Sequence, residues 1–233
     1  MINSGLPLNL PEIKDIALVK ILCAYKAYKE HDNIAQFWHQ TDENGNITAV
    51  MGCINGYLNL WSNNTYPDEV FSFLKFISPN GIFTSKETAE VLKLKINEPC
   101  HCFFKLPPFE RISNTEYKEP RQLLKILRKG LEIPDGDGFV SDVSFRKYHG
   151  CADYVTYDGG GALLYTADSV AIINGIAVPK DKRGKGVGSK LISLLLSCAE
   201  NRTVYTCCTN KNKNFYLKNG FTYFGDAAYC EEK

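Results

Sequence analysis

Hydrophobic positions along the chain change their spacing several times, which predicts an alternation of strands and helices. Residues 12–28 carry apolar side chains three and four positions apart, as an amphipathic helix does. Residues 47–53 form a short apolar run typical of a buried strand, and the Asn44-Gly45 step before it is typical of a β-hairpin turn. The other expected strands of the first half are 34–40, 57–61, 82–84 and 100–106, and its other expected helices are 68–77 and 86–94.

The second half repeats this rhythm. Its expected strands are 109–117, 154–157, 162–166, 170–178, 204–209 and one that begins at 221–223, and its expected helices are 119–131, 138–148, 189–200 and 213–219. Three strands, a helix, a strand, a helix and a strand therefore follow one another in both halves, which makes an internal duplication a hypothesis although no sequence identity links the halves. Pro107-Pro108 marks the expected boundary between a domain of residues 1–107 and one of residues 108–233.

Composition places the chain among globular proteins of one large or two small domains. It has 233 residues, of which 44% are hydrophobic, and 27 Lys and Arg residues face 26 Asp and Glu residues. This balance excludes a global polycation that would hold nucleic acid or an anionic membrane. The start resembles no signal peptide, and no apolar run reaches the ~20 residues of a membrane span. Nine cysteines without a C-x-x-C pair argue against structural zinc, and predict a reduced, cytoplasmic protein.

The segment from Ile176 to Leu191 carries the most chemical information. An apolar strand ends near Val178, a glycine-rich loop follows, and a helix is expected to start near Ser189. Glycines let the main chain approach a ligand closely, and successive N–H groups at a helix start bind phosphate. The spacing fits neither a P-loop nor a dinucleotide-binding fingerprint. The loop is locally basic, with one anion, Asp181, among Lys180, Lys182, Arg183, Lys185 and Lys190.

Two motifs in this half resemble the GNAT superfamily of general N-acetyltransferases. Arg183-x-x-Gly186-x-Gly188 resembles the family signature R-x-x-G-x-G, and Asn214-Phe-Tyr-Leu-Lys-Asn-Gly-Phe221 resembles its F-Y-x-x-x-G-F element. The resemblance runs from about Tyr154 to Tyr223, and more loosely from Phe109. It implies an α+β fold with a twisted mixed β-sheet flanked by helices. Residues 108–233 would be the catalytic acyl-CoA-binding domain, and residues 1–107 a degenerate GNAT-like or accessory domain without a cofactor loop, so that two GNAT-like domains stand in tandem.

The resemblance also implies a site for acetyl-CoA where the fourth and fifth strands of the domain separate. Main-chain N–H groups of the loop would hold the pyrophosphate, and the end of the fourth strand would pair with the pantetheine arm. The candidate cofactor-binding residues are Ile176, Val178, Arg183, Gly184, Lys185, Gly186, Val187, Gly188, Ser189 and Asn212, the last with helix N-capping as its alternative. No metal is expected.

Two residues are candidates for the chemistry. Tyr216 would protonate the departing CoA thiolate, with a role as a core aromatic as the alternative. Many relatives carry a Glu on the fourth strand as the base, but residues 170–178 contain no carboxylate. Asp168, just before this strand, is the candidate base, with a turn or cap role as the alternative. Cys207 and Cys208 end the fifth strand and are interpreted as strand residues, because no paired histidine is identified.

The function expected from these residues is N-acetyl transfer. The enzyme would move an acetyl or other acyl group from acetyl-CoA to a primary amine of a small molecule or peptide by direct attack. A non-catalytic acyl-CoA-binding sensor or scaffold is the alternative, motivated by the missing carboxylate. Nucleic-acid binding is disfavoured because no aromatic residues are interleaved with the lysines. No membrane partner is expected, and a homodimer is left open.

Overall fold

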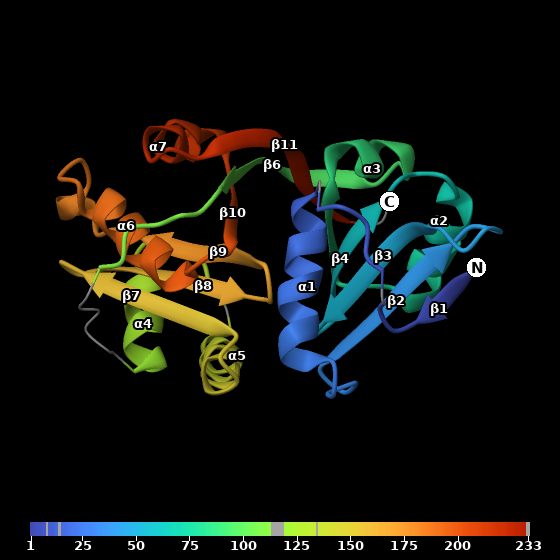
Figure 1. Ribbon diagram of the computed structural model, residues 1–233, viewed down its shortest axis with the longest axis horizontal. Coiled ribbons are helices and arrows are strands. Elements are labelled where there is room, and N and C mark those ends of the chain that lie inside the picture. Colours follow the sequence, from blue (N-terminus) through green and yellow to red (C-terminus); the bar gives the residue numbers. More distant parts are fainter. Residues whose placement is uncertain (8, 14, 113–118, 134, 232–233) are drawn as a thin grey trace. The chain divides into compact units, whose positions relative to one another are not determined.

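The computed structural model in Figure 1 describes residues 1–7, 9–13, 15–112, 119–133 and 135–231. The chain forms two compact units. Unit 1 consists of Met1–Phe103, Cys207–Leu217 and Thr222–Lys233, and unit 2 consists of Phe104–Thr206 and Lys218–Phe221. Each unit contains parallel and antiparallel strand pairs together with helices, which confirms the α+β class expected from the sequence.

Unit 1 is built around a sheet with the strand order β1-β2-β3-β4-β5-β11-β6. Strands β2, β3 and β4 are antiparallel neighbours, whereas β5 runs parallel to β4 after the crossover helix α2. Its elements are β1 (Ile2–Ser4), α1 (Ile16–Tyr28), β2 (Ala35–Thr41), β3 (Ile47–Ile54), β4 (Tyr57–Ser62), α2 (Pro67–Ile77), β5 (Gly81–Ser85), α3 (Lys86–Val91), β6 (Lys95–Lys105) and β11 (Thr222–Glu231). The last two residues of β6 belong to unit 2.

Helices α1 and α2 cover opposite faces of the unit 1 sheet. Met51 packs in one apolar cluster with Leu74 of α2. A Cβ atom at the next residue, Gly52, would lie 3.4 Å from Ile21 of α1. Because successive strand residues face opposite sides of a sheet, these contacts place α1 and α2 on different faces.

The expected hairpin between β2 and β3 is confirmed. Asp42 accepts hydrogen bonds from the N–H groups of Asn44 at 2.9 Å and Asn46 at 2.8 Å. Gly45 has a φ of +81°, which glycine adopts without strain. The turn residues therefore fix this connection locally.

Unit 2 repeats the topology that follows helix α1 in unit 1. Three antiparallel strands are followed by a crossover helix and a parallel strand, in the order β10-β9-β8-β7. Helices α4 and α6 cover opposite faces, because Cβ atoms at the neighbouring Gly161 and Gly160 would meet Leu123 and Leu191 respectively. Its elements are α4 (Pro120–Leu127), α5 (Gly136–Tyr148), β7 (Ala152–Tyr157), β8 (Gly160–Thr166), β9 (Val170–Ala177), α6 (Val187–Ala199) and β10 (Thr203–Cys208). The last two residues of β10 and most of α7 (Lys213–Lys218) belong to unit 1.

Several element bounds differ from the sequence-based expectation. The expected strand 109–117 is wrong for residues 109–112, which are irregular, and its remainder lies outside the described residues. The first helix begins at Ile16 rather than near residue 12 because Asp15 caps it. Helix α6 begins at Val187, earlier than expected, because Gly186 at its N-cap adopts a left-handed conformation. Strand β1 was not expected, since its three residues are too few to give a pattern.

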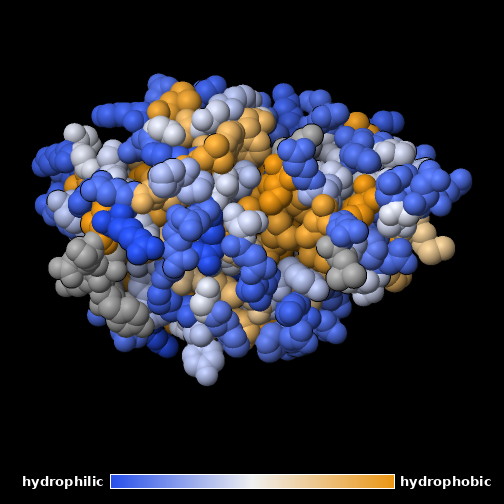
Figure 2. Space-filling view, viewed as in Figure 1, coloured by the Kyte–Doolittle hydropathy of each residue, from blue (hydrophilic) through white to orange (hydrophobic). Residues whose placement is uncertain are grey.

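Among the described residues, no helix combines the length and the apolar character that a bilayer crossing requires. On the face drawn in Figure 2, hydrophilic residues cover most of the surface and apolar residues form smaller areas between them.

Asp15 gives a first testable prediction, about stability and pH. Its Oδ1 atom accepts a hydrogen bond from the Ala17 N–H group at 2.6 Å. Burial raises the pKa of Asp15 to about 6, although the bond from Ala17 lowers it. The Asp15 carboxyl group therefore binds its proton more tightly in the folded state than in the unfolded state. The resulting stabilisation is present below the unfolded pKa and is lost as the pH rises through about 6.

Asp15→Asn keeps an N-cap acceptor and removes the charge. We expect it to raise the free energy of unfolding at pH 7 by about 2–3 kcal/mol relative to the natural chain, and by almost nothing near pH 4. Urea denaturation at both pH values measures this difference. Asp68→Asn, in the exposed first turn of α2, is the matched control and should show no such gain. Equal stability of the Asp15→Asn variant and the natural chain at pH 7 would contradict the prediction.

Candidate functional site

Strands β9 and β10 pair along only part of their length. Their parallel ladder runs from Val170 opposite Thr203 to Ile172 opposite Tyr205. On its other side β9 pairs with β8 as far as Ala177. Asn174 is an extra residue in β9: it lies between the two β9 residues that pair with the adjacent β8 residues Leu163 and Leu164. Such a β-bulge bends a strand and increases its twist. Beyond Ile172, the edge of β9 that faces away from β8 has no strand partner among the described residues, so its main-chain groups are open to a ligand.

The loop after β9 is fixed to its surroundings by two side chains. Arg183 Nε donates a hydrogen bond to the carbonyl oxygen of Val178 at 3.1 Å, which holds the loop against the end of the strand. Lys182 Nζ lies 2.8 Å from Asp158 Oδ1 in the β7–β8 turn. These contacts give the loop a defined shape before any ligand binds.

The glycines of this loop leave its outer side open. Gly184 and Gly186 have φ values of +75° and +83°, and no heavy atom lies within 4 Å of a Cβ atom built on either residue. Other residues would be strained at these φ values. The open space allows a ligand to approach the main chain closely.

Helix α6 starts with free hydrogen-bond donors. Gly186 is its N-cap and supplies no side chain, and the first main-chain bond into the helix runs from the Lys190 N–H group to the Gly186 oxygen at 3.0 Å. Within the described part of the chain, no acceptor faces the N–H groups of residues 184–189. Consecutive free N–H groups at the positive end of a helix dipole form an anion site.

Three cations reinforce this anion site. Lys180, Lys185 and Lys190 are exposed, and none forms an ion pair with a described residue. The structure therefore brings most of the candidate cofactor-binding residues together in unit 2, around the free end of β9. They are Ile176, Val178, Arg183, Gly184, Lys185, Gly186, Val187, Gly188 and Ser189.

Asp168 is not brought to this loop. It is exposed in the turn before β9, at the opposite end of that strand from Val178. With a rise of about 3.3 Å per residue, the strand separates the two residues by about 30 Å.

Asn212 and Tyr216 belong to unit 1. Asn212 is exposed at the end of a single 3₁₀ turn, Asn210–Asn212. Tyr216, on α7, is buried, and its ring stacks on that of Phe103 with the centroids 5.7 Å apart. The packing fixes the ring of Tyr216.

The family comparison agrees with the loop geometry. The family model of the acetyltransferase (GNAT) domain matches residues 138–223. These residues form a GNAT domain. The matched region extends from α5 into the start of β11 and contains the whole glycine-rich loop before α6. A sequence comparison with curated proteins gives no match.

Solved structures show that the fold of the complete chain is also GNAT-like. A GCN5-related N-acetyltransferase from Sphaerobacter thermophilus is similar over 98% of this chain and 94% of its own, with a TM-score of 0.58 and 12% identity. A GCN5-related N-acetyltransferase from Kribbella flavida covers 79% of this chain and 86% of its own, with a TM-score of 0.57 and 13% identity. A tandem GNAT protein from the clavulanic acid biosynthesis pathway covers 84% and 81%, with a TM-score of 0.52 and 9% identity. At these identities the likeness concerns the fold alone.

In unit 1, the described connection before helix α2 differs from the glycine-rich loop before α6. Helix α2 follows β4 in unit 1 as α6 follows β9 in the GNAT domain, but the connecting residues 63–66 contain no glycine. The N–H group of Thr65 is already bonded to Asn63 Oδ1 at 3.0 Å. Asp68 and Glu69 occupy the first turn, where carboxylates compensate the helix dipole and repel phosphate.

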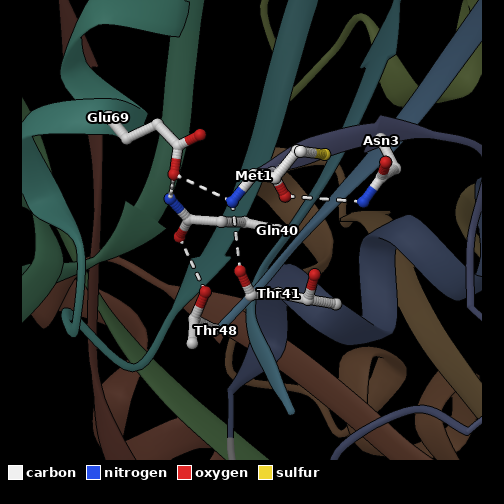
Figure 3. Close-up of polar contacts among 6 residues, drawn as sticks. All are labelled: Met1, Asn3, Gln40, Thr41, Thr48 and Glu69. Atoms are coloured by element: carbon white, nitrogen blue, oxygen red, sulfur yellow. Dashed lines mark hydrogen bonds and ion pairs between the residues drawn. The ribbon is translucent and has the colours of Figure 1, made fainter. Parts of the chain in front are cut away.

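Glu69 is held in this position by neighbouring groups (Figure 3). Its Oε2 atom accepts hydrogen bonds from Gln40 Nε2 at 2.6 Å and from the amino group of Met1 at 3.2 Å. Gln40 is fully buried and accepts a further bond from Thr48 Oγ1 at 2.8 Å. This network gives Glu69 a structural role and leaves the first turn of α2 negative.

One group of reactive side chains was missed by the sequence. Cys207 was interpreted as a strand residue because no histidine accompanies it. In the structure the effects of Cys100, Lys20 and Tyr229 lower the pKa of Cys207 to about 6, against the opposing effect of burial. They come from α1, β11 and β6, so no local motif could have indicated this arrangement.

Proposed function

We propose that the protein is an N-acyltransferase that moves an acetyl or another acyl group from acyl-CoA to a primary amine. The observation that carries this proposal is the anion site of residues 184–189 beside the open edge of β9, inside the GNAT domain. A CoA thioester matches both features, because it carries a pyrophosphate and an arm with amide groups. The GNAT family match supports acetyl transfer as the reaction class.

In this proposal, the anion site binds the donor. The N–H groups from Gly184 to Ser189 hold the pyrophosphate, and Lys185 and Lys190 add positive charge. The main chain at Ile176 and Val178 pairs with the amides of the pantetheine arm, as a neighbouring strand would. Asn212 contributes a further contact to that arm.

The proposed reaction is a direct transfer. The neutral amine attacks the thioester carbonyl carbon, and the tetrahedral intermediate then releases the CoA thiolate. Tyr216 donates a proton to this leaving group. Asp168, just before β9, is the proposed base and takes up the proton of the amine through water, since β9 itself carries no carboxylate.

A charge reversal in the loop tests donor binding. Lys185→Glu combined with Lys190→Glu replaces two exposed cations by anions beside the proposed pyrophosphate. We expect the Kd for acetyl-CoA to rise by about 10- to 100-fold, since an exposed charge pair in water contributes up to about 1 kcal/mol. Isothermal titration calorimetry measures this. The double variant Lys125→Glu and Lys129→Glu, also exposed in unit 2, is the matched control. Equal weakening of binding in both double variants would reject the loop as the donor site.

Thiol release tests the enzymatic proposal itself. Acetyl-CoA at ~100 times its Kd should stabilise the protein by roughly 2.7 kcal/mol whether or not it turns over. The decisive measurement is the release of free CoA in the presence of amino acids, polyamines, aminoglycosides and peptides. An acyltransferase releases CoA with at least one of these amine classes. Tight binding without release in any of them would instead identify an acyl-CoA-binding module.

A further inference from the structure

Unit 1 contains a pocket of about 480 Å³ at one end of its sheet. The ladder between the parallel strands β4 and β5 ends at Leu60 opposite Thr84, and the ladder between β5 and β11 ends at Ser85 opposite Ala227. The pocket lies beyond these ladder ends, and residues at the start of α1 and α3 form part of its wall. Its lining includes four carboxylates, one lysine and one indole, which are Asp15, Glu87, Glu90, Asp226, Lys86 and Trp61. We call this pocket the acidic pocket.

The position of the acidic pocket in the fold is one that ligands commonly occupy. In unit 1 the parallel strands β4 and β5 pair only as far as Leu60 and Thr84, just as β9 and β10 in unit 2 pair only as far as Ile172 and Tyr205. In open sheets, ligands bind in crevices beyond the carboxyl ends of parallel strands. The volume of the acidic pocket also lies within the range of small-molecule sites, about 300–1,000 Å³. The fold therefore gives unit 1 a ligand position of its own.

The charges around the acidic pocket are mainly negative and only partly compensated. Lys86 Nζ lies 3.8 Å from Glu90 Oε1 and offsets the charge of that carboxylate. Asp226 Oδ1 lies 2.7 Å from Nδ1 of His101, whose ring is charged only when it is protonated. Within the described part of the chain, no Lys, Arg or His side chain forms an ion pair with Asp15. The lining therefore favours a cationic ligand.

Asp15 supports this conclusion through its effect on stability. Burial raises the pKa of its carboxyl group to about 6, so that the charged form destabilises unit 1 at neutral pH. Its Oδ1 atom caps α1, but a neutral asparagine would cap the helix as well. Natural proteins retain destabilising residues of this kind mainly at functional sites. A cation bound in the acidic pocket would compensate the charge of Asp15.

The arrangement of the carboxylates favours an extended organic cation over a metal ion. Among the described residues, no three His, Cys, Asp or Glu side chains lie close enough together to hold a metal ion. The pocket carboxylates come from separate elements, with Asp15 at the start of α1, Glu87 on α3 and Asp226 on β11. Trp61 adds an aromatic surface, which attracts ammonium groups and packs against methylene groups. A chain of methylene groups with several ammonium groups along it matches this lining.

We propose that unit 1 binds a linear aliphatic polyamine in the acidic pocket. The ammonium groups of the polyamine pair with Asp15, Glu87 and Asp226, and its methylene chain lies against Trp61. The proposal concerns unit 1 alone and does not depend on acyl transfer by the GNAT domain.

Titration of the full chain with spermidine, in the absence of acyl-CoA, tests the proposal. Both tryptophans lie in unit 1 and Trp61 lines the acidic pocket, so we expect a saturable change in tryptophan fluorescence. Calorimetry measures the Kd independently. Butylamine, with a single ammonium group, should bind at least about 10-fold more weakly, because it pairs with fewer carboxylates. In the Trp61→Phe variant the fluorescence change should be lost while calorimetry still detects binding.

The Asp15→Asn variant locates the bound polyamine. It keeps the N-cap and is expected to be more stable than the natural chain at pH 7, so weaker binding would not result from unfolding. We expect its Kd for spermidine to rise by about 10-fold, because a bond between two charged groups becomes a bond to a neutral amide. Asp68→Asn lies outside the acidic pocket and is the matched control, with an unchanged Kd.

A second pocket variant makes the test independent of the N-cap. Glu87→Gln removes a charge at an exposed position of α3 and should also weaken spermidine binding. Thermal unfolding shows whether each variant folds. The proposal would be overturned by the absence of saturable binding up to about 1 mM spermidine, or by butylamine binding as tightly as spermidine. Equal Kd values for the natural chain and both pocket variants would overturn it as well.

Discussion

Tyr216→Phe is expected to lower kcat for acyl transfer by about 10²–10⁴-fold, with the Kd for acetyl-CoA almost unchanged. The substitution removes only a hydroxyl group. The ring that stacks on Phe103 in the core of unit 1 stays in place, so the fold should be preserved. Without the hydroxyl group, the CoA thiolate must leave without its proton donor. The substitution therefore raises the free energy of the transition state and leaves that of the bound substrate unchanged.

Initial rates of thiol release and calorimetric titration with acetyl-CoA separate these two effects. Tyr223→Phe is the matched control, because the Tyr223 ring also packs on Phe103, with the centroids 5.8 Å apart. Its kcat should stay within about twofold of the natural value, on the order of a surface substitution. An unchanged kcat in the Tyr216→Phe variant would remove Tyr216 from the mechanism.

Ala228→Asp in the last strand is expected to destabilise unit 1 by at least about 3 kcal/mol. Ala228 is fully buried, lies opposite Thr84 of β5 and belongs to an apolar cluster of buried residues in the unit. A carboxylate there would lose its hydration without gaining a cation. A loss of this size is a large part of the stability of a typical domain.

Tryptophan fluorescence reports on this change directly. The chain has two tryptophans, Trp38 and Trp61, and both lie in unit 1. In urea, the fluorescence transition of the Ala228→Asp variant should shift to much lower denaturant. Thr222→Asp introduces the same charge at an exposed position of the same strand and should leave the transition nearly in place. Similar midpoints for both variants would show that β11 contributes little to unit 1.

The sequence predicted the features that depend on neighbouring residues. The hairpin at Asn44-Gly45 and the loop around Arg183 and Gly186 were found because each depends on a few consecutive residues whose conformations are chemically restricted. The α+β class and GNAT-like fold were also predicted, from periodicity and from the two motifs.

Features that depend on distant residues were not predicted. The pairing of β11 with β5 joins segments from opposite ends of the chain. Lys20 sits within an apolar helix pattern, and only the folded chain shows that its partner is Tyr229.

The place of β11 in the sheet bears on how the protein is made. Domains generally fold as they leave the ribosome, the amino-terminal one first. Most of unit 1 precedes unit 2 in the sequence, yet it needs Thr222–Glu231 to pair with β5 and to fill its core. Its nascent sheet must therefore wait, with the edge of β5 unpaired, until residues 222–231 have emerged. The sheet of unit 1 is thus started before unit 2 and completed after it, and an unpaired strand edge of this kind exposes a nascent chain to aggregation.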